Sequence, residues 1–239
     1  MNSHDLILMA IPALVALGGG VLASVWKPDH QTRSLIQHFA AGVVLAALAV
    51  ELLPDIEREH APGLILAASF ALGSLFMYSL KLWTTRLEHR ASMESGVAGL
   101  NVGMLLATFI DVVIDGFIIG AGFAAGGETG TILAVGLSVE LLFLGLALTS
   151  DAISGWRVIV VSGALGLAVL LAALVGNALL TGASHVVIGG ALAFSAAALL
   201  YLVTEELLIE AHVVEERPIS TLVLFGGFLA FWSIQLLGR

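Results

Sequence analysis

Residues 105–122 read LLATFIDVVIDGFIIGAG, an apolar stretch that carries two acidic residues, Asp111 and Asp115. Residues four apart lie one turn apart on an α-helix, so both carboxylates are predicted to point to the same face. A helix this apolar belongs in a lipid bilayer, where an ionised carboxylate costs roughly 2.5–3.5 kcal/mol. Two on one face also repel each other, unless a cation lies between them or one is protonated. The stretch therefore predicts a polar cavity or a bound cation inside a membrane protein.

The composition of the 239-residue chain also indicates a polytopic membrane protein, since 59% of its residues are hydrophobic and only 11% are charged. Its mean hydropathy is +1.06. The absence of cysteine excludes disulfides and thiolate metal sites. The formal net charge of −9 argues against a nucleic-acid partner. No Lys or Arg precedes the first apolar run, so we expect that run to be a retained helix and not a cleaved signal peptide.

The apolar runs predict an all-α protein with eight transmembrane helices. These cover residues 5–26, 34–56, 63–83, 96–125, 129–150, 157–180, 185–211 and 218–237. An even number of spans places both termini on one side of the membrane. Of the 9 Lys and Arg residues, all but Arg58 and Arg239 lie in the odd-numbered connections. By the positive-inside rule, both termini are expected outside a bacterial-type cytoplasmic (inner) membrane.

An internal repeat is visible between residues 39–55 and 194–210, which align at a constant offset of 155. Phe39 matches Phe194, and both segments end in a Glu-Leu-Leu-x-acid pattern. In the predicted topology the two helices run in opposite directions, as the inverted repeats of transporters do. Chance similarity between two helices rich in Ala and Leu is the alternative.

The repeat predicts a single transporter domain with a 3 + 2 + 3 arrangement of helices. The two triplets lie within residues 1–94 and 152–239, and the central pair lies within residues 95–151. The central pair is the part that carries the buried acids.

This pattern resembles the ZIP family of divalent-metal transporters, which have eight helices in a 3 + 2 + 3 arrangement and both termini outside. The best local matches are residues 39–55 and 199–212. In the family, helix 4 carries His-Asn-x-Pro-Glu-Gly, and residues 111–116 read DVVIDG here. The family's His and Glu ligand positions thus fall on Asp111 and Asp115.

Helices 5 and 6 differ more from the family pattern. Glu140 falls at the first ligand position of helix 5, whereas Leu144 stands where the family has a second Glu. In helix 6 the family's Ser-Gly-x-x-Glu corresponds to residues 162–166, SGALG, which lack the Glu. The resemblance therefore implies a single carboxylate site, formed by Asp111, Asp115 and Glu140, in place of the family's two-metal centre.

Carboxylates are hard oxygen ligands, which suit Mn, Mg, Ca or Fe(II) better than metals that favour imidazole or thiolate. Zinc also accepts carboxylates, so zinc, manganese and iron are the transported ions that we expect first. Neutral donors could come from Asn101, Thr108, Ser138 and Asn177. The alternative is that these acids are protonated and only hydrogen-bond between helices, with no functional role. Acids inside membrane spans are, however, usually functional.

Further acids at the helix ends are candidate pathway residues. Glu51 and Asp55 lie near the outer end of the second predicted helix, and the inner ends carry Asp151, Glu205, Glu206 and Glu210. Acidic mouths on both faces would concentrate cations by focusing the electric field. Ordinary solvation at the interface is the alternative.

The function expected is transport of divalent metal ions across the membrane by alternating access, with the bilayer and the cations as partners; a homodimer is compatible with this. Two other functions remain open: a proton-coupled transporter of another substrate on the same scaffold, and a non-transporting membrane sensor or assembly subunit. An enzyme is not expected. The sequence has no nucleophile–base pair, no phosphate-binding loop and no His-x-x-x-His in any span.

Overall fold

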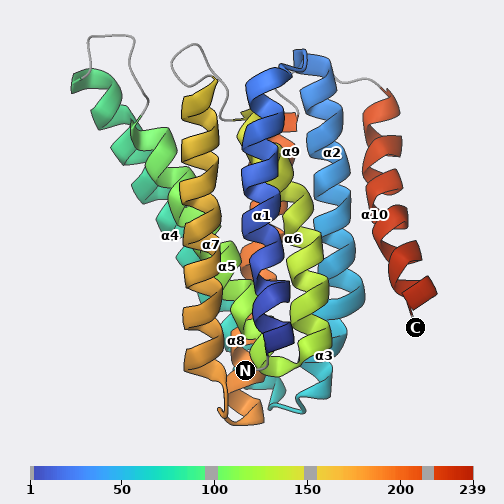
Figure 1. The fold of residues 1–239 in the computed structure, drawn as a ribbon. Coiled ribbons are helices and arrows are strands. Elements are labelled where there is room, and N and C mark those ends of the chain that lie inside the picture. Colours follow the sequence, from blue (N-terminus) through green and yellow to red (C-terminus); the bar gives the residue numbers. More distant parts are fainter. Residues whose placement is uncertain (1–2, 95–101, 148–154, 212–217, 239) are drawn as a thin grey trace.

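The computed structural model describes the backbone of residues 3–94, 102–147, 155–211 and 218–238. These residues form a bundle of long helices packed side by side (Figure 1). The α-helices are α1 (Ser3–Val25), α2 (His30–Ala47), α3 (Leu53–Arg58), α4 (Gly63–Glu94), α5 (Val102–Ala125), α6 (Gly127–Ala147), α7 (Trp156–Leu180), α8 (His185–Leu202), α9 (Leu208–Ala211) and α10 (Pro218–Gly238). Two π-helical segments, η1 (Leu48–Leu52) and η2 (Val203–Leu207), join α2 to α3 and α8 to α9.

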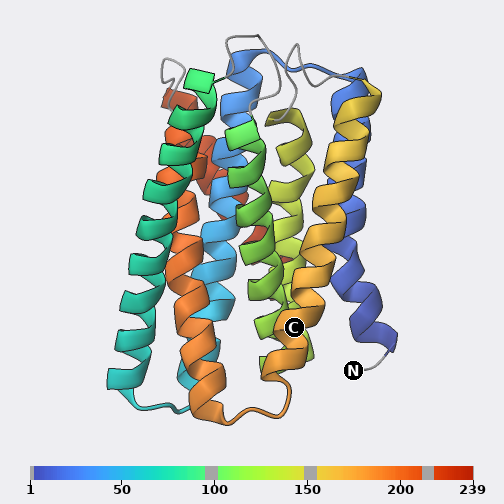
Figure 2. The ribbon, with the colours of Figure 1, turned by 90° about the vertical axis from the view of Figure 1, so that its left-hand side faces the viewer.

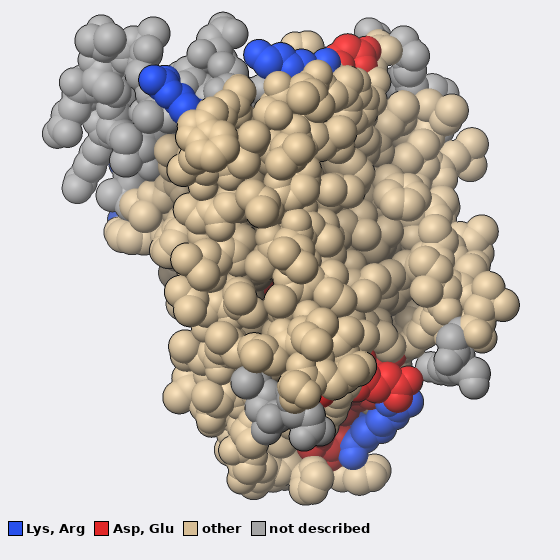
Figure 3. Space-filling view, viewed as in Figure 1, with Lys and Arg blue, Asp and Glu red and all other residues tan. Residues whose placement is uncertain are grey.

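The prediction of an all-α fold with eight apolar helices is confirmed, because eight helices in the described residues are long and apolar enough to cross a bilayer. The α2–η1–α3 segment forms one span, His30–Arg58, and α8 with the first part of η2 forms another, His185–Glu205. Both chain ends lie at the same end of the bundle, which we call the terminal end (Figures 1 and 2). On the face shown in Figure 3, coloured Lys, Arg, Asp and Glu side chains lie mainly near the two ends of the bundle. This charge distribution suits a protein whose middle faces lipid.

The helix of the third span extends beyond the membrane span. The span predicted for residues 63–83 agrees with the apolar stretch Gly63–Arg86, and α4 continues beyond it as one helix to Glu94. The extension reads TTRLEHRASME, which is polar but contains neither Gly nor Pro. Hydropathy marks where a helix leaves the bilayer and not where it ends, and charged residues such as Arg and Glu are good helix formers in water.

The two repeat segments have matching secondary structure from beginning to end. Asp29 caps the N-terminus of α2 by accepting a hydrogen bond from the Thr32 backbone, and Ser184 caps α8 in the same way through Val187. Each helix then runs for 18 residues and passes into a five-residue π segment. The caps, helix starts and π segments are each 155 residues apart, which is the offset found in the sequence. Since α2 runs toward the terminal end and α8 runs away from it, the segments are antiparallel (Figures 1 and 2).

The packing of the peripheral helices repeats in the same way. Helix α10 packs on α2, and α4 packs on α8. In both pairs a glycine lies against a phenylalanine backbone oxygen: Gly227 meets Phe39, and Gly73 meets Phe194. The two phenylalanines are 155 residues apart and the two glycines are 154 apart. Absence of a Cβ at these glycines lets the helix backbones approach closely, as small residues do in membrane bundles.

The α2–α10 contact yields a prediction with a matched control. A Cβ at Gly227 would overlap the backbone of Phe39, whereas a Cβ at Gly226 would meet no atom within 4 Å. Gly227→Ala should therefore destabilise the protein by about 1–3 kcal/mol. Gly226→Ala should be neutral or slightly stabilising, because alanine favours helix. Thermal unfolding of the two purified variants in detergent checks this, and equal melting temperatures would contradict the close packing.

Candidate functional site

The three acids expected to form a metal site line one cavity. Asp111 and Asp115 come from α5, Glu140 comes from the antiparallel helix α6, and the cavity has a volume of about 100 Å³. Asp115 is 2% exposed, and Asp111 and Glu140 are partly buried. The spacing of one turn brings both aspartates to the α6 side of α5. We call this space the carboxylate cavity.

Two uncharged polar residues also line the carboxylate cavity, and the rest of its described lining is apolar. Thr108 lies one turn before Asp111 on α5, as expected of a neutral donor. Gln37 of α2, which the sequence analysis missed, is 7% exposed and also lines the cavity. Its position in LIQHFAAG, next to polar residues at the start of the helix, resembles that of an interfacial residue. A buried amide facing acids adds a third helix to the site.

The other neutral donors do not line the carboxylate cavity. Ser138 donates a hydrogen bond to the Ala134 carbonyl in its own helix, and Asn177 accepts one from Thr181. Both contacts are local, between residues four apart in the sequence. Asn101 lies outside the described residues.

The carboxylate cavity is not a preformed metal centre. Within the described part of the chain, no three His, Cys, Asp or Glu residues are grouped closely enough to hold one ion together. The expectation that Asp111, Asp115 and Glu140 converge within reach of a single ion is thus not met in this conformation. Carboxylates that share a cavity repel one another, which favours separation until a cation is present.

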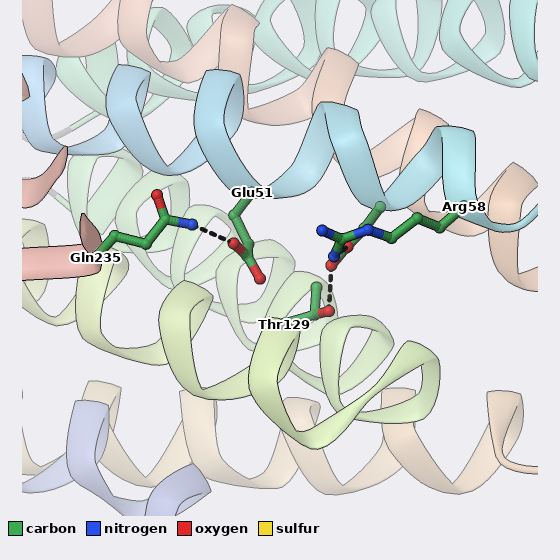
Figure 4. Close-up of polar contacts among 5 residues, drawn as sticks. Glu51, Arg58, Thr129 and Gln235 are labelled. Atoms are coloured by element: carbon green, nitrogen blue, oxygen red, sulfur yellow. Dashed lines mark hydrogen bonds and ion pairs between the residues drawn. The ribbon is translucent and has the colours of Figure 1, made fainter. Parts of the chain in front are cut away.

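A second group of polar contacts lies nearer the terminal end, and we call it the polar seam (Figure 4). It consists of Glu51, Asp55, Arg58, Thr129 and Gln235. Glu51 and Asp55, both predicted as pathway residues, are only 3% and 5% exposed. These acids are therefore buried in the bundle and are not solvated side chains at the interface.

The polar seam joins three helical segments that are far apart in the sequence. Gln235 of α10 donates a hydrogen bond of 2.5 Å from Nε2 to Oε2 of Glu51 in η1. Thr129, in the first turn of α6, donates to Oδ2 of Asp55 in α3. Arg58 donates from Nη1 to the other oxygen of Asp55 at 2.5 Å. The acids could be identified from the sequence but their partners could not, because no local pattern indicates which helix a buried carboxylate will face.

The predicted pathway residues of the opposite end are described only in part. Glu205 is exposed in η2. The side chains of Glu206 and Glu210 and the whole of Asp151 lie outside the described residues.

No protein-family model matches the chain, and no curated protein matches it either.

The cavity geometry predicts how one charge affects stability. Asp115→Asn keeps the side-chain shape and relieves repulsion from Asp111 and Glu140, so metal-free protein should become more stable by about 1 kcal/mol. For a chain of this size, that corresponds to a rise in Tm of about 2–4 °C. Ser138→Ala on the neighbouring helix, outside the cavity, should not raise Tm. Thermal unfolding in a chelating buffer measures both, and a lower Tm for Asp115→Asn would contradict mutual repulsion.

Proposed function

We propose that this protein transports divalent metal cations across a membrane by alternating access and is a divergent relative of the ZIP family. The observation that carries the proposal is the carboxylate cavity. Asp111, Asp115 and Glu140 come from two adjacent helices and share one small cavity in a bundle suited to a bilayer. Burying three acids together in such a place is costly, and a cation would offset the cost.

The matched halves of the chain support a 3 + 2 + 3 inverted-repeat architecture. The caps and π segments of α2 and α8 share one offset, and α10 packs on α2 as α4 packs on α8. Transporters built from inverted repeats bind substrate at the repeat interface and alternate by movement of one part against another. In this proposal the central helices α5 and α6 move against the flanking triplets.

The lining chemistry suggests a cation bound by oxygen. The polar side chains that line the carboxylate cavity carry carboxylate, amide and hydroxyl groups, and the described residues of its lining include no His. A volume of about 100 Å³ has room for a few waters, each of which occupies about 30 Å³ in the liquid. A partly hydrated Mn²⁺, Fe²⁺ or Zn²⁺ would thus fit, and would then draw the carboxylates closer. Hard oxygen ligands favour manganese or iron over zinc.

The basic residues orient the proposed transporter. With Lys27 and Arg157 at the end opposite the termini, the terminal end would face outward from a bacterial-type inner membrane. A C-terminal tag should then be reachable in intact cells. On this topology Gln37 and Glu140 lie in the cytoplasmic halves of their helices, and Asp111 and Asp115 lie near the middle of α5.

Calorimetric titration of the purified protein with Mn²⁺ and Zn²⁺ tests the proposed cation site. Wild-type protein should bind, and affinity should weaken as the pH falls because protons compete for the carboxylates. Asp111→Asn and Asp115→Asn should each weaken binding at least about tenfold, since even partners of a metal ligand contribute this much. Ser138→Ala should bind like the wild type. Equal binding by all four proteins, or none by the wild type between mildly acidic and mildly alkaline pH, would contradict a cation site.

One observation favours a second candidate, a proton-coupled transporter of another substrate. The described residues contain no group of three His, Cys, Asp or Glu side chains placed to hold an ion. Buried carboxyl groups that exchange protons need not converge on one point. Proton flux into proteoliposomes without flux of any divalent metal would support this candidate. If neither flux is found, a non-transporting sensor or assembly subunit becomes the better proposal.

A further inference from the structure

The polar seam lies between the carboxylate cavity and the terminal end of the bundle. On α2 and η1, 14 residues separate Gln37 of the cavity from Glu51 of the seam, which corresponds to roughly 20 Å along the helix. On α6, 11 residues separate Glu140 from Thr129, or roughly 16 Å. Two independent helices thus place the seam at a similar distance from the cavity and in the same direction.

A second cavity lies beside the polar seam and extends toward the terminal end of the bundle, and we call it the vestibule. It has a volume of about 500 Å³ and lies between α1, α6 and α10. Asp5 and Glu128 line it, and no Lys or Arg is among the described residues of its lining. Gln235 lines the vestibule and also donates to the buried carboxylate of Glu51. The seam is therefore the boundary at which the vestibule meets the interior of the bundle.

Apolar side chains separate the polar seam from the carboxylate cavity. On α6, Thr129, Leu133, Leu137 and Glu140 recur at spacings of three and four residues, so they share one helix face. Leu133 and Leu137 are 0% and 2% exposed. A cation that travelled along this face would cross the seam first, and the carboxylates would receive it only after the two leucines had been exposed.

We propose that the polar seam is a gate, closed in this structure, between the vestibule and the carboxylate cavity. This inference rests on the proposed transport function. Glu51–Gln235 ties η1 to α10, and Asp55–Thr129 ties α3 to α6. Opening separates α6 and α10 from the α2–η1–α3 segment. The Glu51 carboxylate and the Asp55 oxygen that Thr129 held then face the incoming cation, while Arg58 stays paired with the other oxygen of Asp55. Gln235 and Thr129 are positioning residues, since they hold the acids and keep the helices together.

The absence of cysteine makes the gate directly measurable, because a single introduced thiol is then the only one in the protein. The reporter is Leu133→Cys, whose position lies behind the seam. The protein is reconstituted into vesicles in which a C-terminal tag faces the outside. A charged, membrane-impermeant methanethiosulfonate reagent is added outside, and the rate of thiol modification is measured without metal.

Thr129→Val and Gln235→Leu remove the two donors with little change in shape. Combined in the reporter background, they should raise the modification rate on the order of tenfold, because each loss leaves a buried carboxylate without that hydrogen bond. Each single variant should give a smaller increase. Thr129→Ser keeps a hydroxyl group at this position, so the reporter protein with this one substitution should be modified at the same rate as the reporter alone.

Thr131→Val is the matched control. Thr131 is two residues along the same helix and also borders the vestibule, but it donates to the Gly127 carbonyl of its own helix. Its replacement should leave the modification rate unchanged. If the double variant does not fold, as judged by size-exclusion chromatography, the single variants test the gate.

An unchanged rate in the folded Thr129→Val and Gln235→Leu variants, or an equal increase with Thr131→Val, would overturn the gate. The measurement is independent of cargo, so the gate and the transport proposal fail separately. If the seam variants change the thiol modification rate but the protein transports no divalent metal, the gate is retained and metal transport is rejected. Metal uptake by a protein whose reporter does not respond to the seam variants would retain metal transport and reject the gate.

Discussion

Charge buried in an apolar bundle is the constraint on which the rest of this structure depends. Five acids, Asp111, Asp115, Glu140, Glu51 and Asp55, lie partly or fully buried within helices suited to a bilayer. Each ionised carboxylate in such a place costs several kcal/mol unless it is hydrated, paired or protonated. The fold meets this cost in two ways. The polar seam supplies hydrogen-bond donors from other helices, and the carboxylate cavity keeps a small space beside its acids.

The repeated halves of the chain share a backbone but differ in their polar chemistry. Asp29 and Ser184 begin the two matched segments, and η1 and η2 end them at the same offset. A π segment inside a helix carries a small energetic cost and is frequent at functional sites. Here each π segment carries a glutamate: Glu51 in η1, and Glu206 at the matching position of η2. When α4 and α10 are aligned on Gly73 and Gly227, the residue of α4 that corresponds to Gln235 is Lys81. The partner of Glu51 is thus replaced by a basic residue in the other half. The two ends of the bundle are therefore chemically different.

Much of the fold could be predicted because a bilayer allows few solutions. Backbone groups in lipid must be paired within helices, so runs of apolar residues predict eight spans directly. One-turn spacing likewise predicted that Asp111 and Asp115 share a face, and both line the carboxylate cavity with Glu140.

Features set by contacts between distant helices could not be predicted. Gln37 reaches the carboxylate cavity because α2 packs against α6, and Thr129 meets Asp55 because α3 lies beside the first turn of α6. No local pattern carries that information. The continuation of α4 beyond its membrane span could not be predicted from hydropathy, because Lys81 and Arg86 mark an exit from lipid but do not stop a helix. The π segments also lack a local signature, since Leu48–Leu52 contains only residues common in α-helices.

Uptake of divalent ions into proteoliposomes tests the central claim most directly. Vesicles containing wild-type protein, Asp115→Asn or Ser138→Ala would be compared for uptake of Mn²⁺, Fe²⁺ and Zn²⁺ over a range of pH. Transport through the carboxylate cavity predicts uptake of at least one of these ions by the wild type and by Ser138→Ala, and a rate near that of empty vesicles for Asp115→Asn. Uptake that is equal in all three proteins, or absent for every ion in the wild type, would contradict it.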